Sequence, residues 1–465
     1  MNLNNYHNVY FIGIGGIGMS AIARWFNLEG RFVAGYDKTS TPLTNSLQKE
    51  GIEVHFDDDV EFIPEKIKKE KEHTLVVYTP AVPKHHKEYN YLLDQGYLVQ
   101  KRSQVLGLIA REQFTIAVAG THGKTTTSSM IAHILHEAGL NSVGFLGGVL
   151  QNYDSNLVIR GKGEPDTKVV VEADEFDRSF LTLNPDYAVI TSADADHLDI
   201  YGSHKELIQS FGEFIKKIKA GGKLFINSRI ADDFSCPESV RKFTYSMEKG
   251  DFYSDKIQPG PGFFTFDYVS SSIRITDLQL NVPGFHNVEN VVAAISVSLA
   301  LGIDEKSIRK AVSSYRGVKR RFDYKIKSDK LVYIDDYAHH PTEINALLDS
   351  VRALYPNKKM TVVFQPHLYS RTRDFAEGFS ESLSKADELV MLNIYPAREL
   401  PIEGVDSNMI LRKATCKEKY LIEDDDLMEW LSKRDLEVLL TVGAGDIDRF
   451  VEPIREMLKK GESYA

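Results

Sequence analysis

The sequence predicts an α/β protein of three domains, because one pattern of segments occurs three times. In each repeat a short apolar run rich in Val, Ile and Phe is followed by a turn and then by an amphipathic stretch, beginning near residues 9, 114 and 331. This order is typical of parallel α/β units. The repeats predict domains over residues 1–110, 111–320 and 321–465.

The three predicted domains differ in kind. We expect Rossmann-like first and third domains and a P-loop-type mononucleotide-binding central domain. Between about residues 240 and 285 the sequence alternates apolar and polar residues, with Gly and Pro at turns. This alternation predicts a small antiparallel excursion within the central domain.

Composition excludes several classes of protein. The chain of 465 residues has 56 basic and 66 acidic residues, a net charge of -10, which does not favour nucleic acid or an anionic membrane. Cys236 and Cys416 are far apart and lack a metal-ligand spacing. The first residues lack a basic segment followed by a long apolar one, and no later apolar run is long enough to span a membrane. We expect a cytoplasmic protein.

The first glycine loop follows the first apolar run. Gly13, Gly15 and Gly18, with Gly16 among them, form a G-x-G-x-x-G pattern before a helical stretch, and Asp37 ends the next apolar run. Such glycines let backbone amides approach a diphosphate, and the acid reaches a ribose hydroxyl. The pattern fits NAD and a nucleotide sugar equally well, and a purely structural turn is the alternative.

A second glycine loop follows the strand-like run TIAVA and opens a helix. It consists of Gly120, Thr121, His122, Gly123, Lys124, Thr125 and Thr126. Backbone amides, an ammonium and a hydroxyl in this order predict a triphosphate site, with Lys124 on the β- and γ-phosphates and Thr125 on Mg²⁺. The loop departs from the usual pattern because Val118 occupies the first glycine position.

Acidic residues follow two further apolar runs of the central domain. Parallel strands would deliver such side chains toward the phosphate loop, where a hard divalent cation needs oxygen ligands. His197 could bind a second metal ion. The alternative for each residue is helix capping or a solvated loop. The residues are Glu172, Asp174 and Glu175 after the first run, and Asp194, Asp196, His197 and Asp199 after the second.

Eight ordered motifs make the chain resemble the Mur ligase superfamily over nearly its whole length. The motifs are FIGIGGIGMS, GTHGKTTT, VVEADEFDRSFL, ADHLDIYG, PGFHNVENVVAA, GVKRRFD, DDYAHHPTEI and FQPHLYSRTRDF. The resemblance is strongest to the branch that adds alanine. It implies a UDP-binding first domain, a central ATPase domain and a C-terminal domain that receives the amino acid.

The resemblance also implies a reaction, which would join L-alanine to the lactyl carboxylate of UDP-N-acetylmuramate through an acyl phosphate, at the expense of ATP. The product would be a precursor of cell-wall peptidoglycan. The expected cofactor is Mg²⁺ or Mn²⁺, and the expected assembly is a monomer or a weak homodimer.

Several roles are implied by the resemblance alone. Glu172 is similar to the family's Mg²⁺ ligand beside Thr125, and His197 to a ligand of a second ion. Arg321 resembles an arginine that contacts the phosphates, with Arg320 as its neighbour; a solvated arginine is the alternative. A conserved block of the family lines the nucleotide site, unless it only caps a helix, and matches His286, Asn287 and Asn290.

The predicted third domain contributes two motifs to the implied site. The DDYAHH motif places Asp336 at the nucleotide and Tyr337 and His339 at the amino acid, with His339 or His340 as the general base. The resemblance places the next motif at the amino acid or the acyl phosphate, and this agrees with the ability of guanidinium groups to hold carboxylates and stabilise oxyanions. A surface salt bridge is the alternative for its two arginines. Its residues are His367, Arg371 and Arg373.

Three other functions are alternatives to this one. The nearest is a ligase that recycles murein by attaching a whole tripeptide to the same sugar nucleotide, and the FIGIGGIGMS opening favours the alanine-adding branch over it. An NAD-dependent oxidoreductase would leave GTHGKTTT and the acidic cluster unexplained. A nucleotide-dependent switch without synthesis would turn over ATP slowly, whether or not sugar nucleotide or alanine is present.

Overall fold

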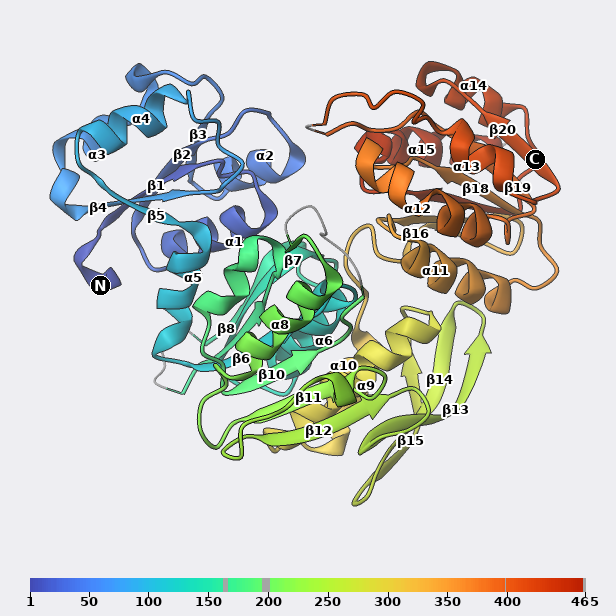
Figure 1. Cartoon of the computed structure of the whole chain (residues 1–465), viewed down its shortest axis with the longest axis horizontal. Coiled ribbons are helices and arrows are strands. Elements are labelled where there is room, and N and C mark those ends of the chain that lie inside the picture. The colour runs from blue at the N-terminus through green and yellow to red at the C-terminus, as the bar shows by residue number, and fades with distance from the viewer. Residues whose placement is uncertain (162–165, 195–200, 398, 463–465) are drawn as a thin grey trace. The chain divides into compact units, whose positions relative to one another are not determined.

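The computed structural model describes residues 1–161, 166–194, 201–397 and 399–462. The chain forms two compact units. The first comprises Met1–Asp255, Tyr268–Thr276 and Glu289–Tyr315, and the second comprises Lys256–Asp267, Asp277–Val288 and Arg316–Ala465. In the described part, strands form three sheets, with helices beside them (Figure 1). The α/β class and the parallel strands are as predicted.

The first sheet is wholly parallel, with strand order β3-β2-β1-β4-β5. Residues alternate between its faces, so Val9 and Phe11 pack toward α1, whereas Tyr10 and Ile12 pack with Ile67 of α3 and the helix α4. The strands are β1 (Asn8–Ile12), β2 (Phe32–Tyr36), β3 (Glu53–His55), β4 (Thr74–Tyr78) and β5 (Leu98–Lys101). The helices are α1 (Ile17–Leu28), α2 (Pro42–Lys49), α3 (Glu65–Lys69), α4 (Lys87–Asp94) and α5 (Arg102–Arg111).

The second sheet has the order β12-β11-β10-β6-β9-β7-β8 within the first unit, and only the β7·β8 pair there is antiparallel. Strands β13, β14 and β15 follow β12 and have residues in both units. The strands are β6 (Phe114–Ala119), β7 (Ser142–Leu150), β8 (Ser155–Arg160), β9 (Lys168–Glu172), β10 (Tyr187–Ile190), β11 (Lys223–Asn227), β12 (Arg241–Ser246), β13 (Phe252–Gly260), β14 (Phe263–Ser270) and β15 (Arg274–Leu280). The helices are α6 (Lys124–Glu137), α8 (His204–Ile215), α9 (Phe285–Ala300) and α10 (Glu305–Ser314).

The third sheet lies in the second unit, with order β16-β17-β21-β18-β19-β20 and an antiparallel β16 at its edge. Its strands are β16 (Asp323–Lys327), β17 (Val332–Asp336), β18 (Met360–Phe364), β19 (Glu388–Met391), β20 (Glu418–Leu421) and β21 (Val438–Val442). Its helices are α11 (Pro341–Leu354), α12 (Tyr369–Leu383), α13 (Asn408–Lys413), α14 (Leu427–Ser432) and α15 (Val451–Glu462).

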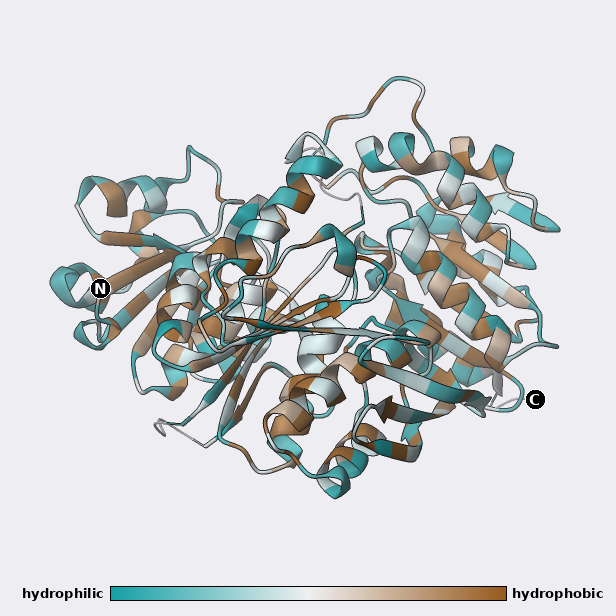
Figure 2. Ribbon diagram, turned by 60° about the horizontal axis from the view of Figure 1, so that its bottom comes forward, coloured by the Kyte–Doolittle hydropathy of each residue, from teal (hydrophilic) through white to brown (hydrophobic). Residues whose placement is uncertain are grey.

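Local sequence explains where several helices begin. Thr41 caps α2 with its side chain on the Thr44 amide, and Pro42 occupies the first helical position. Asp304 caps α10 in the same way. Hydrophobic residues concentrate along the inner strands, whereas the helices carry hydrophilic residues on other faces (Figure 2). Among the described helices, none has the length and apolar character that a bilayer span requires.

The first two predicted domains share one buried core within the first unit. A single cluster of buried apolar side chains includes Phe11 and Phe26 of the first sheet region and Val171 and Ile190 of the second. Trp25 of α1 reaches across to Phe145 of β7, with ring centroids 6.5 Å apart. The two sheets are therefore joined by packing as well as by the chain.

Candidate active site

The second glycine loop lies at the carboxyl end of β6, between β10 and β9. The chain leaves β6 at Ala119, and α6 begins at Lys124. Gly120 and Gly123 have φ of +133° and +80°, values that favour glycine. The carboxyl ends of parallel strands at such a position form the usual ligand crevice of an open α/β sheet. The loop is therefore built to present amides and the start of a helix to an anion.

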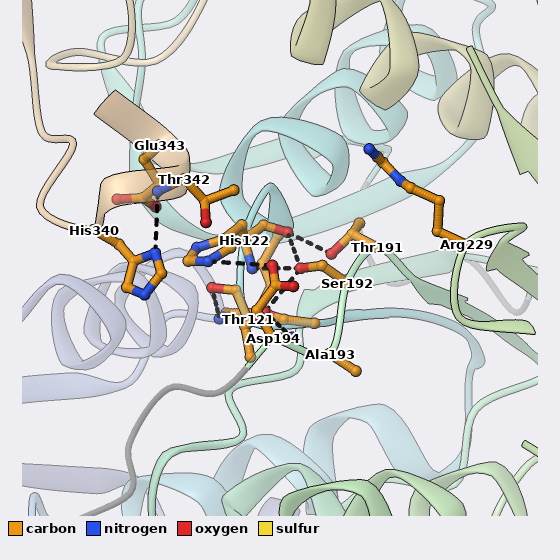
Figure 3. A network of polar contacts seen from close by, with 12 residues as sticks. Thr121, His122, Thr191, Ser192, Ala193, Asp194, Arg229, His340, Thr342 and Glu343 are labelled. Carbon is orange, nitrogen blue, oxygen red and sulfur yellow. Dashed lines mark hydrogen bonds and ion pairs between the residues drawn. The ribbon is translucent and has the colours of Figure 1, made fainter. Parts of the chain in front are cut away.

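Residues after β10 clamp this loop from one side, as Figure 3 shows. The Ser192 hydroxyl accepts a hydrogen bond from the His122 amide at 2.8 Å and lies 2.9 Å from the Thr121 hydroxyl. The Asp194 amide donates to the Thr121 hydroxyl at 3.1 Å, and the Asp194 carboxylate lies 3.5 Å from His122 Nε2. The Thr191 hydroxyl donates to the His122 carbonyl. Sequence reasoning identified Asp194 but missed Thr191 and Ser192.

Lys124 folds back over the loop that it ends. Its ammonium donates to the Gly120 carbonyl at 2.7 Å and to Glu175 Oε1 at 2.8 Å. Burial alone would lower the pKa of Lys124, but the charges of Glu175, Asp174 and Glu172 raise it overall. Burial raises the pKa of the Glu175 carboxyl, while Lys124 opposes that shift. The 2.8 Å contact supports a charged pair, so Lys124 is an ammonium at neutral pH.

Glu172 and Thr125 lie on the elements that flank the loop. Glu172 ends β9, next to Val118 of β6, and its Oε2 accepts from the Gly147 amide at 3.0 Å. Thr125 is in the first turn of α6 and is largely buried. A hydroxyl and a carboxylate are hard oxygen donors, which suit Mg²⁺ when phosphate oxygens and water complete its shell. Among the described residues no three His, Cys, Asp or Glu side chains group into a metal site of their own.

His197, Asp196 and Asp199 lie outside the described residues. The predicted second metal ligand therefore has no geometry here. Thr126 is buried in the first turn of α6.

Asn290, from the first turns of α9, contacts the loop directly within the first unit. Its Oδ1 accepts from the Thr127 hydroxyl at 3.2 Å, and a Cβ on Gly123 would lie only 2.7 Å from that same oxygen. Asn287 and His286 belong to the second unit. The Asn287 amide donates to the Pro283 carbonyl at 2.8 Å, and burial lowers the pKa of His286 to about 4.

The first glycine loop has a different set of neighbours. It runs from Gly13 to Gly16 between β1 and α1, with φ of +87° at Gly13. Asp37 Oδ2 accepts from the Gly15 amide at 2.7 Å, so this carboxylate lies within the loop itself. Gly18 is in the first turn of α1, where a Cβ would lie 2.8 Å from the guanidinium of Arg102.

Arg102, Glu172 and Asp174 also line one small pocket in the first unit. The basic side chain of Arg102 therefore lies between Gly18 of α1 and a pocket that has acidic residues of the predicted central domain in its lining.

In the second unit, Asp336 ends β17 and is buried. Its carboxylate accepts from the Phe322 amide at 2.6 Å and the Ala338 amide at 2.8 Å. Burial raises the pKa of Asp336 to about 6, although Arg321 opposes the shift. The structure thus gives Asp336 a role in holding the turn around Arg321.

The two neighbouring histidines are held differently. His339 Nδ1 lies 3.0 Å from the Tyr337 carbonyl, an acceptor, so Nδ1 carries the proton and Nε2 keeps its lone pair. Burial lowers the pKa of His339 to about 4, against the effect of Glu343. His340 Nδ1 instead accepts from the Thr342 amide at 3.3 Å and caps α11. The His340 ring packs edge-on against Phe375.

Arg320 and Arg321 have different partners as well. Arg320 lies 3.1 Å from the buried Asp335 carboxylate and donates to the Gly443 carbonyl at 2.8 Å. Arg321 lies 3.7 Å from Glu343, and its guanidinium lies 5.1 Å from the Tyr337 ring centre. The Arg320 guanidinium also lies over the Tyr337 ring, at 5.3 Å. Arg320 therefore joins the buried Asp335 carboxylate to the DDYAHH turn, whereas Arg321 contacts the same turn beside Glu343.

The three predicted residues of the FQPHLYSRTRDF motif also differ in their surroundings. The His367 ring lies 6.3 Å from the His339 ring and stacks on Tyr395 at 5.8 Å. Arg371 is partly buried, and its charge contributes to the low pKa of His339. Arg373 is 51 % exposed and pairs with the adjacent Asp374, which is the surface role given above as the alternative.

The fold and the loop at Gly120–Lys124 together define a multidomain α/β protein with a P-loop-type turn at the carboxyl ends of the central parallel strands of its second sheet. Models of the Mur ligase family match three segments of the chain: the family's catalytic domain at residues 8–114, its middle domain at 118–298 and its glutamate ligase domain at 320–445. The chain is also 50 % identical over 459 residues to the UDP-N-acetylmuramate–L-alanine ligase of Flavobacterium psychrophilum, covering 98 % of this chain and 99 % of the relative.

Two further comparisons agree. The corresponding ligase of Flavobacterium johnsoniae is 49 % identical over 460 residues, covering 99 % of this chain and 100 % of that one. The solved UDP-N-acetylmuramate-alanine ligase of Thermotoga maritima has a TM-score of 0.82 at 29 % identity, covering 98 % and 99 % of the two chains. The chain therefore belongs to the Mur ligase family.

Proposed function

We propose that this protein joins L-alanine to the lactyl carboxylate of UDP-N-acetylmuramate and converts ATP to ADP and phosphate. The observation that carries the proposal is the loop at Gly120–Lys124, which the ends of β9 and β10 flank with oxygen-bearing side chains. The names of the relatives supply the substrates, and their identity over the whole chain favours alanine over a tripeptide.

The chemistry requires that the carboxylate first acquire a leaving group. In the proposed first step a lactyl carboxylate oxygen attacks the γ-phosphorus of ATP, an acyl phosphate forms and ADP leaves. Lys124 would stabilise the charge on the transferring phosphoryl oxygens, with Arg321 assisting. Thr125 and Glu172 would hold a Mg²⁺ ion, which neutralises phosphate charge.

The second step forms the amide. The unprotonated alanine nitrogen attacks the acyl carbon, and the tetrahedral intermediate releases inorganic phosphate. We assign the removal of the amine proton to His339, because its Nδ1 donates to the Tyr337 carbonyl and its Nε2 therefore keeps a lone pair. The Nδ1 of His340 is already used as an acceptor in capping α11, which makes His340 the weaker candidate.

Single-turnover amide formation by His339→Gln and His340→Gln tests this assignment. We expect a loss of about 10²-fold for His339→Gln, the usual contribution of a general base. His340→Gln should lower the thermal midpoint and change the single-turnover rate by less than about threefold, because a cap contributes to stability. Equal rates for the two variants would refute the assignment.

The reaction itself is tested by phosphate release from ATP and Mg²⁺ in the presence of UDP-N-acetylmuramate, with L-alanine and the tripeptide added in separate wells. Release that requires both the sugar nucleotide and L-alanine is expected. Release that requires the tripeptide would assign the recycling reaction instead. Release that neither acceptor stimulates would refute a ligase function on this sugar nucleotide.

A further inference from the structure

A buried polar cluster connects the first domain to the central domain within the first unit. Arg24, in the middle of α1, is 5 % exposed, and Asn156, at the start of β8, is fully buried. Nη1 of Arg24 donates to Oδ1 of Asn156 across 132 residues of sequence. The Nε and Nη2 groups of Arg24 donate to the Glu50 carboxylate at 2.8 and 2.7 Å. Neither residue has a part in the chemistry proposed above.

The Asn156 side chain holds the first turn of α1. Its amide nitrogen donates to the Ile17 carbonyl at 2.5 Å and to the Ser20 hydroxyl at 2.9 Å. Ile17 is the first residue of α1 and directly follows Gly16 of the first glycine loop. A side chain from the central domain therefore fixes the helical turn next to that loop.

Glu50 extends the cluster to α2, at whose end it lies. Thr44 of that helix packs against the loop, because a Cβ on Gly15 would lie only 2.7 Å from Cγ2 of Thr44. The contacts of Arg24 therefore position both α1 and α2, the two helices next to the first glycine loop.

On the other side, the cluster reaches the phosphate site through one hairpin. Asn156 is the second residue of β8, which pairs with β7, and the Gly147 amide of β7 donates to the Glu172 carboxylate. Figure 1 shows α1 beside this hairpin, and α1 contacts both of its strands. Trp25 and Phe145 add apolar packing next to the polar contacts.

We propose that Arg24 and Asn156 are positioning residues, which fix the first glycine loop relative to Glu172 and the triphosphate loop. The inference rests on the proposed function, in which the sugar nucleotide bound at the first loop must present its carboxylate to ATP. A shift of about 1 Å between reacting groups can cost about 10²-fold in rate. The pair acts on the alignment of two bound substrates, and each substrate keeps its own contacts.

The kinetic test compares Asn156→Ala and Arg24→Gln with the matched control Arg31→Gln. Arg31 lies just beyond α1 and donates to the Leu3 and Tyr6 carbonyls, so all these contacts stay within the first domain. We expect kcat to fall about 10- to 100-fold in Asn156→Ala and in Arg24→Gln. Their Kd values for ATP and for UDP-N-acetylmuramate should stay within about threefold of the parent. The control should lose thermal stability and keep its kcat at 25 °C.

The loss in the double variant should be smaller than the product of the two single losses, because both changes break the same Arg24–Asn156 contact. An unchanged kcat in Asn156→Ala would overturn the inference. So would a fall in kcat matched by the Arg31→Gln control, since that would reflect general destabilisation.

A distance measurement needs no turnover. Nitroxide labels at Lys69→Cys and Lys216→Cys, two exposed positions of the first unit, would be placed in a chain with Cys236→Ser and Cys416→Ser. We expect a narrow distance distribution that broadens when Asn156→Ala is added. An equally narrow distribution would overturn the inference even if the parent enzyme failed to form the amide, so the two failures are distinguishable.

Discussion

The two glycine loops share a backbone design and differ in charge. Each follows a buried strand of a parallel sheet and leads into a helix, at Gly13–Gly16 and at Gly120–Gly123. The second loop ends in Lys124, whose ammonium lies over it. In the first loop, a carboxylate oxygen of Asp37 accepts from a loop amide.

This difference shows that glycine spacing determines the turn and that the neighbouring side chains determine the ligand. A triphosphate carries enough charge to need a cation in addition to amides. A diphosphate linked to a ribose can use fewer positive groups, and an acid beside it suits the sugar hydroxyls. Four experiments test whether the two loops differ in this way.

The largest effect is expected for Lys124→Met. Removal of the ammonium should lower kcat by on the order of 10³-fold, because the lysine stabilises the transferring phosphoryl group. Phosphate release measures kcat, and calorimetry should show unchanged affinity for UDP-N-acetylmuramate. A variant that retained a tenth of the parental kcat would argue against a triphosphate at this loop.

A methyl group at a loop glycine should harm the second loop more than the first. A Cβ on Gly120 would lie 2.1 Å from the Thr191 hydroxyl, at φ of +133°, whereas a Cβ on Gly13 would meet a methyl group of Thr79 at 2.9 Å. We expect kcat/KM for ATP to fall about 10²-fold in Gly120→Ala. In Gly13→Ala, kcat/KM for the sugar nucleotide should fall about tenfold.

Gly221→Ala is the matched control for both variants. Gly221 has a φ of +80° with open space around its Cβ position, so it carries the backbone strain without any contact to a loop. Its kcat/KM values should equal those of the parent. Equal losses in the two loop variants would contradict the difference between the loops.

A smaller change is expected for Asp37→Asn. The amide oxygen can still accept from the Gly15 amide, but the charge that strengthens a bond to a ribose hydroxyl is lost. The KM for UDP-N-acetylmuramate should rise about fivefold, with the KM for ATP unchanged. A rise in the KM for ATP alone would reverse the assignment of the two loops.

The smallest effect is a shift in the thermal midpoint on ligand binding. Saturating UDP should raise the midpoint of the parent and of Lys124→Met by about 2–4 °C, because it stabilises the folded state only. Saturating ATP with Mg²⁺ should raise that of the parent but not that of Lys124→Met. A UDP effect lost together with the lysine would mean that the two loops form one site.

Sequence reasoning succeeded where the information was local. The apolar runs, the turns and the helix starts predicted parallel α/β units and the two glycine-loop turns, because each depends on neighbouring residues. The clamp formed by Thr191 and Ser192 was missed, since it depends on β10 and β6 being adjacent. Strand order is a tertiary property that spacing along the chain does not reveal.

The same limit applies to individual arginines. Arg320 and Arg321 are adjacent in sequence, and only the fold separates the one bound to Asp335 from the one paired with Glu343. Arg24 stands in an ordinary helical stretch, and its partner Asn156 is 132 residues away. A strong signal in sequence existed for the loops, whereas none existed for the contacts between domains.

The buried core shared by the first two domains bears on how chimeric ligases could be made. Because Arg24 and Trp25 of the predicted first domain contact Asn156 and Phe145 of the predicted central domain, the predicted boundary near residue 110 is not a safe point for exchange. A first domain from a relative would meet a mismatched β7·β8 hairpin. An exchange that transfers α1, α2 and that hairpin together keeps each partner with the one it evolved beside.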